Sequence, residues 1–182
     1  MDTLHEVLKF NEEFVANKEY VPYETTGLPD KKIVILSCMD TRLVELLPRA
    51  MNLKNGDVKI VKNAGAVVSH PFGSIMRSIL VAVYELQAEE VWVIGHHDCG
   101  MGKVDPDELL HKMEDSVTKE VVSSMKHVGI DLHSWLQGFT TVQDGVRGSV
   151  SMIENHPLLP KDLPVHGLVI DPATGKLDRV TE

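Results

Sequence analysis

The chain has two cysteines, Cys38 and Cys99, and His96 precedes the second in the pattern His-x-x-Cys. Thiolate and imidazole groups are preferred ligands of Zn²⁺, and this spacing lets two side chains converge across a tight turn. Adjacent side chains diverge, so His96 is a better candidate ligand than His97. With no third cysteine, a closed site with three or four thiolates is impossible. Cys38, His96 and Cys99 therefore predict a Zn²⁺ site with an open fourth position, as in catalytic zinc.

A carboxylate and a guanidinium follow the first cysteine, as Asp40 and Arg42. In an extended segment, residues two apart point the same way, and an arginine fork binds a carboxylate through two hydrogen bonds. Such a pair would keep Asp40 ionised and ready to accept a hydrogen bond from a hydroxide at the metal. Without Arg42, a carboxylate so close to zinc would tend to coordinate it, so Asp40 is also the conditional fourth ligand.

Each of these signals has a plainer interpretation when it is taken alone. A cysteine after a strand is usually a small buried residue, and Asp-x-Arg is most often a surface salt bridge. The remaining histidines are expected to be surface residues or satisfied core residues: His5, His70, His111, His127, His133, His156 and His166. The metal hypothesis gains weight because both cysteines fall at predicted strand ends.

Hydrophobic periodicity predicts the elements that carry these residues. Apolar runs predict strands at residues 32–37, 57–61 and 91–95, and the first reads as a strand buried on both faces. Helical spacing predicts helices at residues 2–17, 43–51, 71–87, 105–127 and 142–155. Two runs at residues 167–171 and 176–180, on either side of Pro172-Ala173-Thr174-Gly175, predict a hairpin.

This alternation predicts an α/β fold: a mostly parallel central sheet flanked by helices, with a C-terminal hairpin strand. In such sheets, sites form at the carboxyl ends of the strands. Cys38 follows the first predicted strand, and His96 and Cys99 follow the third. All three are therefore expected at one edge of the sheet.

Length, charge and composition restrict the class of protein. A chain of 182 residues, 43% of them hydrophobic, is expected to form a single domain over residues 1–182. A net charge of −9 disfavours a nucleic-acid partner, and no apolar run approaches the length of a membrane span. We expect no signal peptide and a cytoplasmic protein with reduced thiols. The N-terminal helix and arm, residues 1–30, include a proline-containing connector, so this helix can pack on a partner subunit.

Three short motifs occur in order along the chain, with a fourth stretch near its end: Cys38-Met39-Asp40-Thr41-Arg42-Leu43, Lys62-Asn63-Ala64-Gly65, Gly95-His96-His97-Asp98-Cys99-Gly100-Met101 and Val165-His166-Gly167-Leu168-Val169-Ile170-Asp171. In these motifs the chain resembles the β-class carbonic anhydrases, most closely their compact prokaryotic branch. The resemblance implies a β-carbonic-anhydrase-like fold, Zn²⁺ held by Cys38, His96 and Cys99, and a dyad of Asp40 and Arg42. It also implies a homodimer or a dimer of dimers, with active sites at the subunit interface and the N-terminal helix packed on the partner.

The activity that the resemblance implies is the reversible hydration of CO₂ to bicarbonate and a proton by a hydroxide at the zinc. Backbone N–H groups near Gly65 are expected to help place the substrate. Two alternatives stay open: hydrolysis of COS or CS₂ at the same site, and a non-catalytic zinc protein with Asp40 as permanent fourth ligand. Some family members have a regulatory bicarbonate pocket, but Ile35 and Lys62 replace its tryptophan and arginine, so we expect no such pocket. Position 97 is commonly threonine in the family, and His97 has no assigned role.

Overall fold

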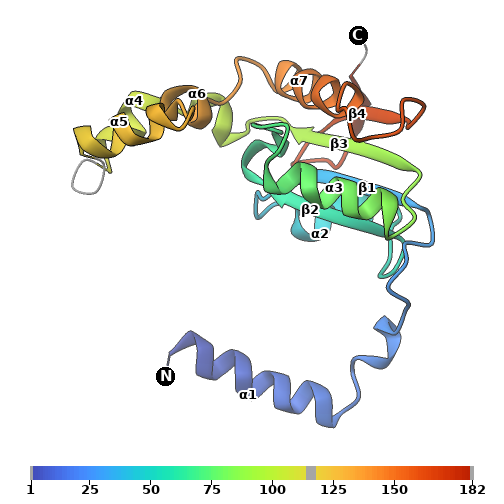
Figure 1. Ribbon diagram of the computed structural model, residues 1–182. Coiled ribbons are helices and arrows are strands. Elements are labelled where there is room, and N and C mark those ends of the chain that lie inside the picture. Colours follow the sequence, from blue (N-terminus) through green and yellow to red (C-terminus); the bar gives the residue numbers. More distant parts are fainter. Residues whose placement is uncertain (1, 114–117, 181–182) are drawn as a thin grey trace.

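The computed structural model describes residues 2–113 and 118–180, which form an α/β fold (Figure 1). Its sheet contains β1 (Ile33–Cys38), β2 (Val58–Asn63), β3 (Glu90–His96), β4 (Val165–Ile170) and β5 (Leu177–Arg179), in the spatial order β2-β1-β3-β4-β5. The first four strands in this order run parallel, and β5 pairs with β4 antiparallel. The predicted fold class, including the C-terminal hairpin strand, is confirmed.

Helices cover both faces of this sheet. Helices α3 (Ser74–Tyr84) and α7 (Val142–Glu154) pack on one face, and α2 (Leu43–Ala50) packs on the other. Val34 and Leu36 of β1 belong to the core under α3 and α7, whereas Ile35 belongs to the core under α2. All three side chains are fully buried. Because β1 is buried on both faces, its sequence is continuously apolar rather than alternating.

The remaining helical segments are short: η1 (Val21–Tyr23), η2 (Ala64–Ala66), η3 (Gly100–Lys103), α4 (Pro106–His111), α5 (Lys119–His127) and α6 (Leu132–Leu136). The single helix expected over residues 105–127 is wrong, because the chain turns at Lys112 and Met113 and a new helix starts after Thr118. The Thr118 hydroxyl caps this helix by accepting a hydrogen bond from the Val121 N–H at 3.4 Å. Residues 114–117 of the expected helix lie outside the described residues.

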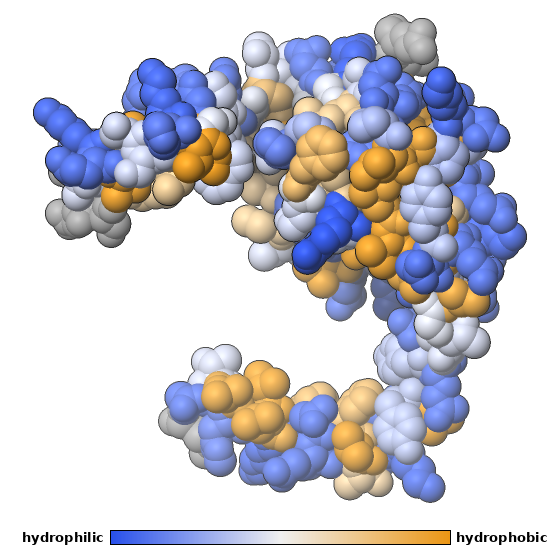
Figure 2. All heavy atoms as spheres, in the orientation of Figure 1, coloured by the Kyte–Doolittle hydropathy of each residue, from blue (hydrophilic) through white to orange (hydrophobic). Residues whose placement is uncertain are grey.

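The N-terminal helix α1 (Thr3–Ala16) stands apart from the rest of the molecule (Figure 1). Asp2 caps it by accepting a hydrogen bond from the His5 N–H at 3.1 Å, and no residue of the helix is buried. Figure 2 shows apolar side chains gathered on this helix, and the large exposed ones are Leu4, Val7, Leu8, Phe10 and Val15. Within the described residues, no helix combines the length and apolar character that crossing a membrane requires.

Candidate metal centre

Two neighbouring parallel strands bring the sulfur and nitrogen ligands together. Cys38 is the last residue of β1 and His96 is the last residue of β3, and these strands pair directly. Cys99 follows His96 after a tight turn in which Asp98 has a φ of 53°. The Sγ atoms of Cys38 and Cys99 are 3.9 Å apart, and the ligand atoms of all three residues lie within 4.8 Å of one another. The three predicted residues therefore form a buried group that can hold a metal ion.

The imidazole of His96 has one satisfied nitrogen and one that lacks a partner. Its Nδ1 lies 2.8 Å from the His97 carbonyl oxygen, so this nitrogen carries the hydrogen and donates it. Its Nε2 is buried and has no hydrogen-bond partner within the described part of the chain. Leaving a buried polar atom unpaired costs about 1–3 kcal/mol. A metal ion would give this nitrogen a partner, so the residues fit a zinc site.

The protonation states of the two thiols, Cys38 and Cys99, depend on their surroundings. Burial by itself raises the pKa of Cys38, but the neighbouring His96 imidazole and the Gly65 N–H bring this pKa down to about 7. Burial raises the pKa of Cys99 to about 11. A bound cation favours the thiolate form of both sulfurs, and two thiolates with one neutral imidazole are a donor set typical of zinc.

The Asp40 carboxylate is held by Arg42, as predicted. Arg42 Nε donates to Oδ1 at 3.0 Å and Nη2 donates to Oδ2 at 2.8 Å, and this pairing holds the pKa of Asp40 well below its usual range. The extended geometry expected for this segment is wrong, because Arg42 has φ −64° and ψ −21° where the chain turns into α2. The turn adds a third hydrogen bond, from the Arg42 backbone N–H to Oδ1 at 2.9 Å.

Asp40 also faces the space between the three candidate ligands. Its Oδ2 lies 3.6 Å from His96 Nε2, yet Asp40 is not part of the three-residue group. Arg42 extends further, and its Nη2 donates to the Asp98 carbonyl oxygen at 3.4 Å. The guanidinium therefore ties the carboxylate to the turn that carries Cys99. The hollow beside these residues is completed by largely apolar side chains of Met39, Ala64 and Met101.

The backbone N–H of Gly65 points at the first cysteine, to which it donates at a distance of 3.3 Å from Cys38 Sγ. Sequence reasoning expected this amide to help place a substrate, and that role stays a prediction. Gly65 has a φ of 80°, which is the left-handed region that favours glycine. Added at this position, a Cβ would lie 2.8 Å from Met101 Cγ.

Gly65→Ala is expected to lower the free energy of unfolding by about 1–3 kcal/mol, because the left-handed conformation and the close Met101 side chain both oppose a methyl group. Gly148→Ala is the matched control. Gly148 is exposed within α7, and no atom lies within 4 Å of a Cβ added there. This control should gain about 0.5–1 kcal/mol through its better helix propensity. Urea unfolding of the two variants measures both values, and equal stabilities would contradict the assigned strain.

The role of His97 could not be assigned from the sequence, and the structure directs its side chain away from the three ligands. The side chain is exposed and borders a hollow that includes Gln143 and Asp178. The backbone of His97 supports the site instead. Its carbonyl oxygen accepts a hydrogen bond from His96 Nδ1, and its N–H donates to the carbonyl oxygen of Ile170 at 3.1 Å. The peptide of His97, rather than its imidazole, therefore orients the candidate ligand.

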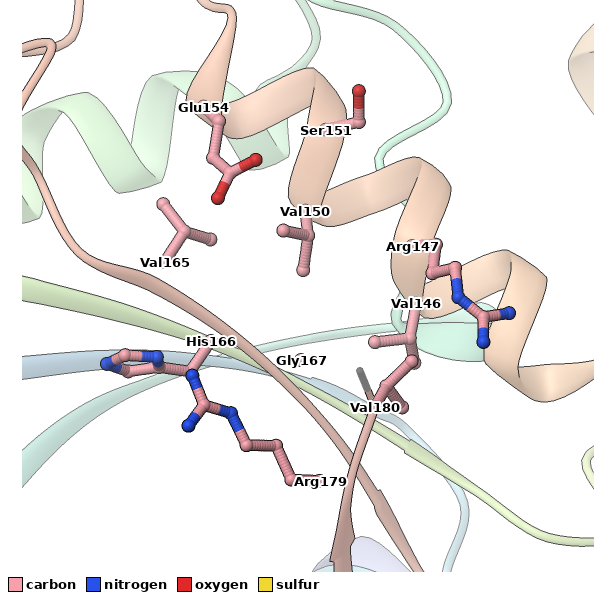
Figure 3. Close-up of a pocket in the computed structure, with 10 residues that line it drawn as sticks. All are labelled: Val146, Arg147, Val150, Ser151, Glu154, Val165, His166, Gly167, Arg179 and Val180. Atoms are coloured by element: carbon pink, nitrogen blue, oxygen red, sulfur yellow. The ribbon is translucent and has the colours of Figure 1, made fainter. Parts of the chain in front are cut away.

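A separate hollow lies between α7 and the strands β4 and β5 (Figure 3). Val150 and Val165 form part of its apolar wall, while Arg179 and Glu154 bring opposite charges to its lining. None of the three candidate metal ligands lines it. This hollow is therefore distinct from the metal centre.

Comparison with known proteins agrees with this geometry. The carbonic anhydrase family model matches residues 33–177. YtiB of Bacillus subtilis (strain 168), provisionally named as a carbonic anhydrase, is 58% identical over 181 residues, which cover 99% of this chain and 97% of that protein. The crystal structure of β-carbonic anhydrase isoform I from Trichomonas vaginalis is similar with a TM-score of 0.87 and 31% identity, and the match covers 100% of this chain and 99% of that one. Carbon disulfide hydrolase from Saccharolobus solfataricus is 26% identical over 92% of this chain and 86% of that protein. The chain belongs to the β-carbonic anhydrase family.

Proposed function

We propose that this protein is a zinc enzyme that catalyses the reversible hydration of CO₂ to bicarbonate and a proton. The observation that carries the proposal is the buried Cys38–His96–Cys99 group beside a carboxylate fixed by an arginine. Zinc in such a site supplies a Lewis acid that lowers the pKa of a water ligand to about 7. Cys38, His96 and Cys99 would hold the ion, in agreement with the unpartnered Nε2 of His96.

In this proposal, Asp40 orients the attacking oxygen by accepting its hydrogen bond at Oδ2, and Arg42 prevents the carboxylate from turning away. Both oxygens of Asp40 already bind Arg42, so the carboxylate enters the reaction preorganised. The apolar walls formed by Met39 and Met101 suit a small, uncharged substrate such as CO₂. A cytoplasmic location, in which both thiols stay reduced, is part of the same proposal.

The assay that tests this function compares CO₂ with COS and CS₂ on one zinc-loaded sample. The proposal expects rapid CO₂ hydration in a stopped-flow indicator assay and little sulfide release from the two sulfur compounds. The sulfur substrates belong in the test because one relative is named a carbon disulfide hydrolase. Faster turnover of COS or CS₂ than of CO₂ would replace the proposed substrate while leaving the metal site in place.

A non-catalytic zinc protein, with Asp40 as a permanent fourth ligand, is the second alternative. The double hydrogen bond from Arg42 opposes it, because coordination would have to compete with two charge-assisted hydrogen bonds. A zinc-loaded sample that stays inactive from pH 6 to pH 9 would favour this alternative. Measurable CO₂ hydration by the zinc-loaded sample within this pH range would instead oppose it.

We also propose that the chain forms a homodimer, alone or within a dimer of dimers, in which α1 and its arm, residues 1–30, pack on the partner. The support is that α1 buries none of its residues although it carries several large apolar side chains. Leu8→Asp is expected to shift the molar mass measured by light scattering toward the monomer, because a charge would enter the apolar contact. Lys9→Gln changes the net charge by the same amount on the opposite, polar face of α1 and is the control. An unchanged mass for Leu8→Asp would contradict this packing.

A further inference from the structure

The buried turn after β2 determines where the Gly65 N–H points. Residues Gly65 and Ala66 are both buried, and both have positive φ, of 80° and 57°. For alanine this left-handed conformation costs about 1–2 kcal/mol, so contacts from outside the turn must maintain it. Asn63 provides local support: its side chain binds both the N–H and the carbonyl of Val67, at 3.2 and 2.6 Å.

The side-chain hydroxyl of Ser149 in α7 also forms hydrogen bonds with the backbone of this turn. Ser149 is 2% exposed, and its Oγ donates to the Ala66 carbonyl oxygen at 3.2 Å while it accepts from the Val68 N–H at 3.0 Å. The carbonyl and the N–H that it binds flank Val67. Ser149 therefore holds the backbone on both sides of Val67, next to the strained Ala66, through two hydrogen bonds between segments more than 80 residues apart.

An aromatic ring packs against the face of the turn where a Gly65 side chain would project. A Cβ built at Gly65 would lie 3.2 Å from Phe139 Cε1, and one built at Gly102 would lie 3.3 Å from Phe139 Cε2. A Cβ built at Gly145 of α7 would overlap the same ring. Gly65 donates to Cys38, and Gly102 follows Cys99 in η3. The ring of Phe139 therefore lies against two segments: the turn whose Gly65 N–H binds Cys38, and η3, which follows Cys99.

We propose that Ser149 and Phe139 are positioning residues that hold the Gly65 N–H on the sulfur of Cys38. This proposal rests on the role of Cys38 as a metal ligand, but neither Ser149 nor Phe139 would touch the metal or the substrate. Groups that hydrogen-bond or orient metal ligands are commonly worth 10–100-fold in affinity or activity, that is about 1.4–2.7 kcal/mol. An N–H donor stabilises the thiolate lone pairs, so withdrawing it makes the sulfur a stronger electron donor to the metal.

The test uses the full-length protein with Co²⁺ in place of Zn²⁺, because the sulfur-to-cobalt charge-transfer band reports directly on the thiolate. In Ser149→Ala and Phe139→Leu, this band is expected to move to lower energy, since the sulfur loses its donor. In the zinc forms, kcat should fall about tenfold with KM unchanged, and the zinc content should stay at that of the wild type. Ser149→Thr keeps the hydroxyl and should restore both the band and kcat.

Ser151→Ala is the matched control, since it removes a hydroxyl from an exposed position two residues further along the same helix. A band that stays at the wild-type energy in either variant removes that residue from the proposal, even if thermal stability falls. A band shift of the same size in Ser151→Ala would overturn it as well. If the zinc-loaded wild type hydrates no CO₂, the proposed function fails, whereas the cobalt spectra still decide whether the turn is positioned in this way.

Discussion

His96→Ala is expected to remove bound zinc and to lower CO₂ hydration by more than about 100-fold, because only two thiols would remain to bind the ion. The structure leaves His96 Nε2 buried without a partner in the described residues, so this nitrogen is the clearest gap that a metal would fill. Zinc content is measured by mass spectrometry after dialysis against a weak chelator, and activity is measured by stopped flow. The wild type should retain about one zinc per chain under the same conditions.

His97→Ala is the control for that experiment, because it removes the same side chain from the adjacent position. The His97 side chain is exposed, and its contribution to the site comes from the backbone carbonyl, which alanine retains. Zinc content and activity should therefore stay close to those of the wild type. If His96→Ala kept its zinc, or if His97→Ala lost zinc to the same extent, the assignment of the nitrogen ligand would be wrong.

Arg42→Gln is expected to lower CO₂ hydration by about 10²–10³-fold while zinc stays bound, because the carboxylate loses both guanidinium hydrogen bonds. The pKa of Asp40 would rise toward its ordinary value near 4, which still leaves the carboxylate ionised at pH 7. Lost activity would therefore report on the direction in which Asp40 points, or on its coordination to zinc, and not on its protonation. Asp40→Asn should have a comparable effect, because the amide cannot replace the carboxylate as a pure acceptor.

The sign of the pH effect follows from the depressed pKa of Asp40 in the folded state. A group of this kind stabilises the fold above its unfolded pKa, and the contribution disappears as the pH falls through the folded pKa. Asp40 is therefore ionised throughout the range from pH 5 to pH 9, and its titration does not contribute to a rate change there.

Arg49→Gln is the control for Arg42→Gln, since Arg49 lies in α2 with a side chain 82% exposed. Loss of activity in Arg49→Gln would show that the effect of Arg42→Gln is not specific to the site.

The sequence was sufficient to predict the sheet edge at which the site lies. Cys38 and His96 each close an apolar strand, and parallel neighbouring strands bring such ends together without further information. The His-x-x-Cys spacing likewise predicted that Cys99 would return to the same place. The approach of Asp40 and Arg42 was predicted correctly for the wrong geometric reason, because the pair forms in a turn at the start of α2 rather than in an extended segment.

Residues that act through tertiary contacts could not be found in this way. Ser149 and Phe139 carry no motif, and their contacts with the Gly65 turn connect segments more than 70 residues apart. The left-handed conformation of Ala66 could not be predicted from the sequence either, because alanine ordinarily avoids this conformation. The break between α4 and α5 was missed because the expected helix was extended through Thr118, which instead caps the start of α5.

The measurement that tests the central claim most directly is zinc content together with CO₂ hydration across pH, on one purified sample. We expect about one zinc per chain and a hydration rate that rises as the pH passes through about 7. Removing the zinc with a chelator should abolish the rate, and returning it should restore the rate. A sample that holds zinc at Cys38, His96 and Cys99 yet hydrates no CO₂ anywhere from pH 6 to pH 9 would contradict the proposed activity.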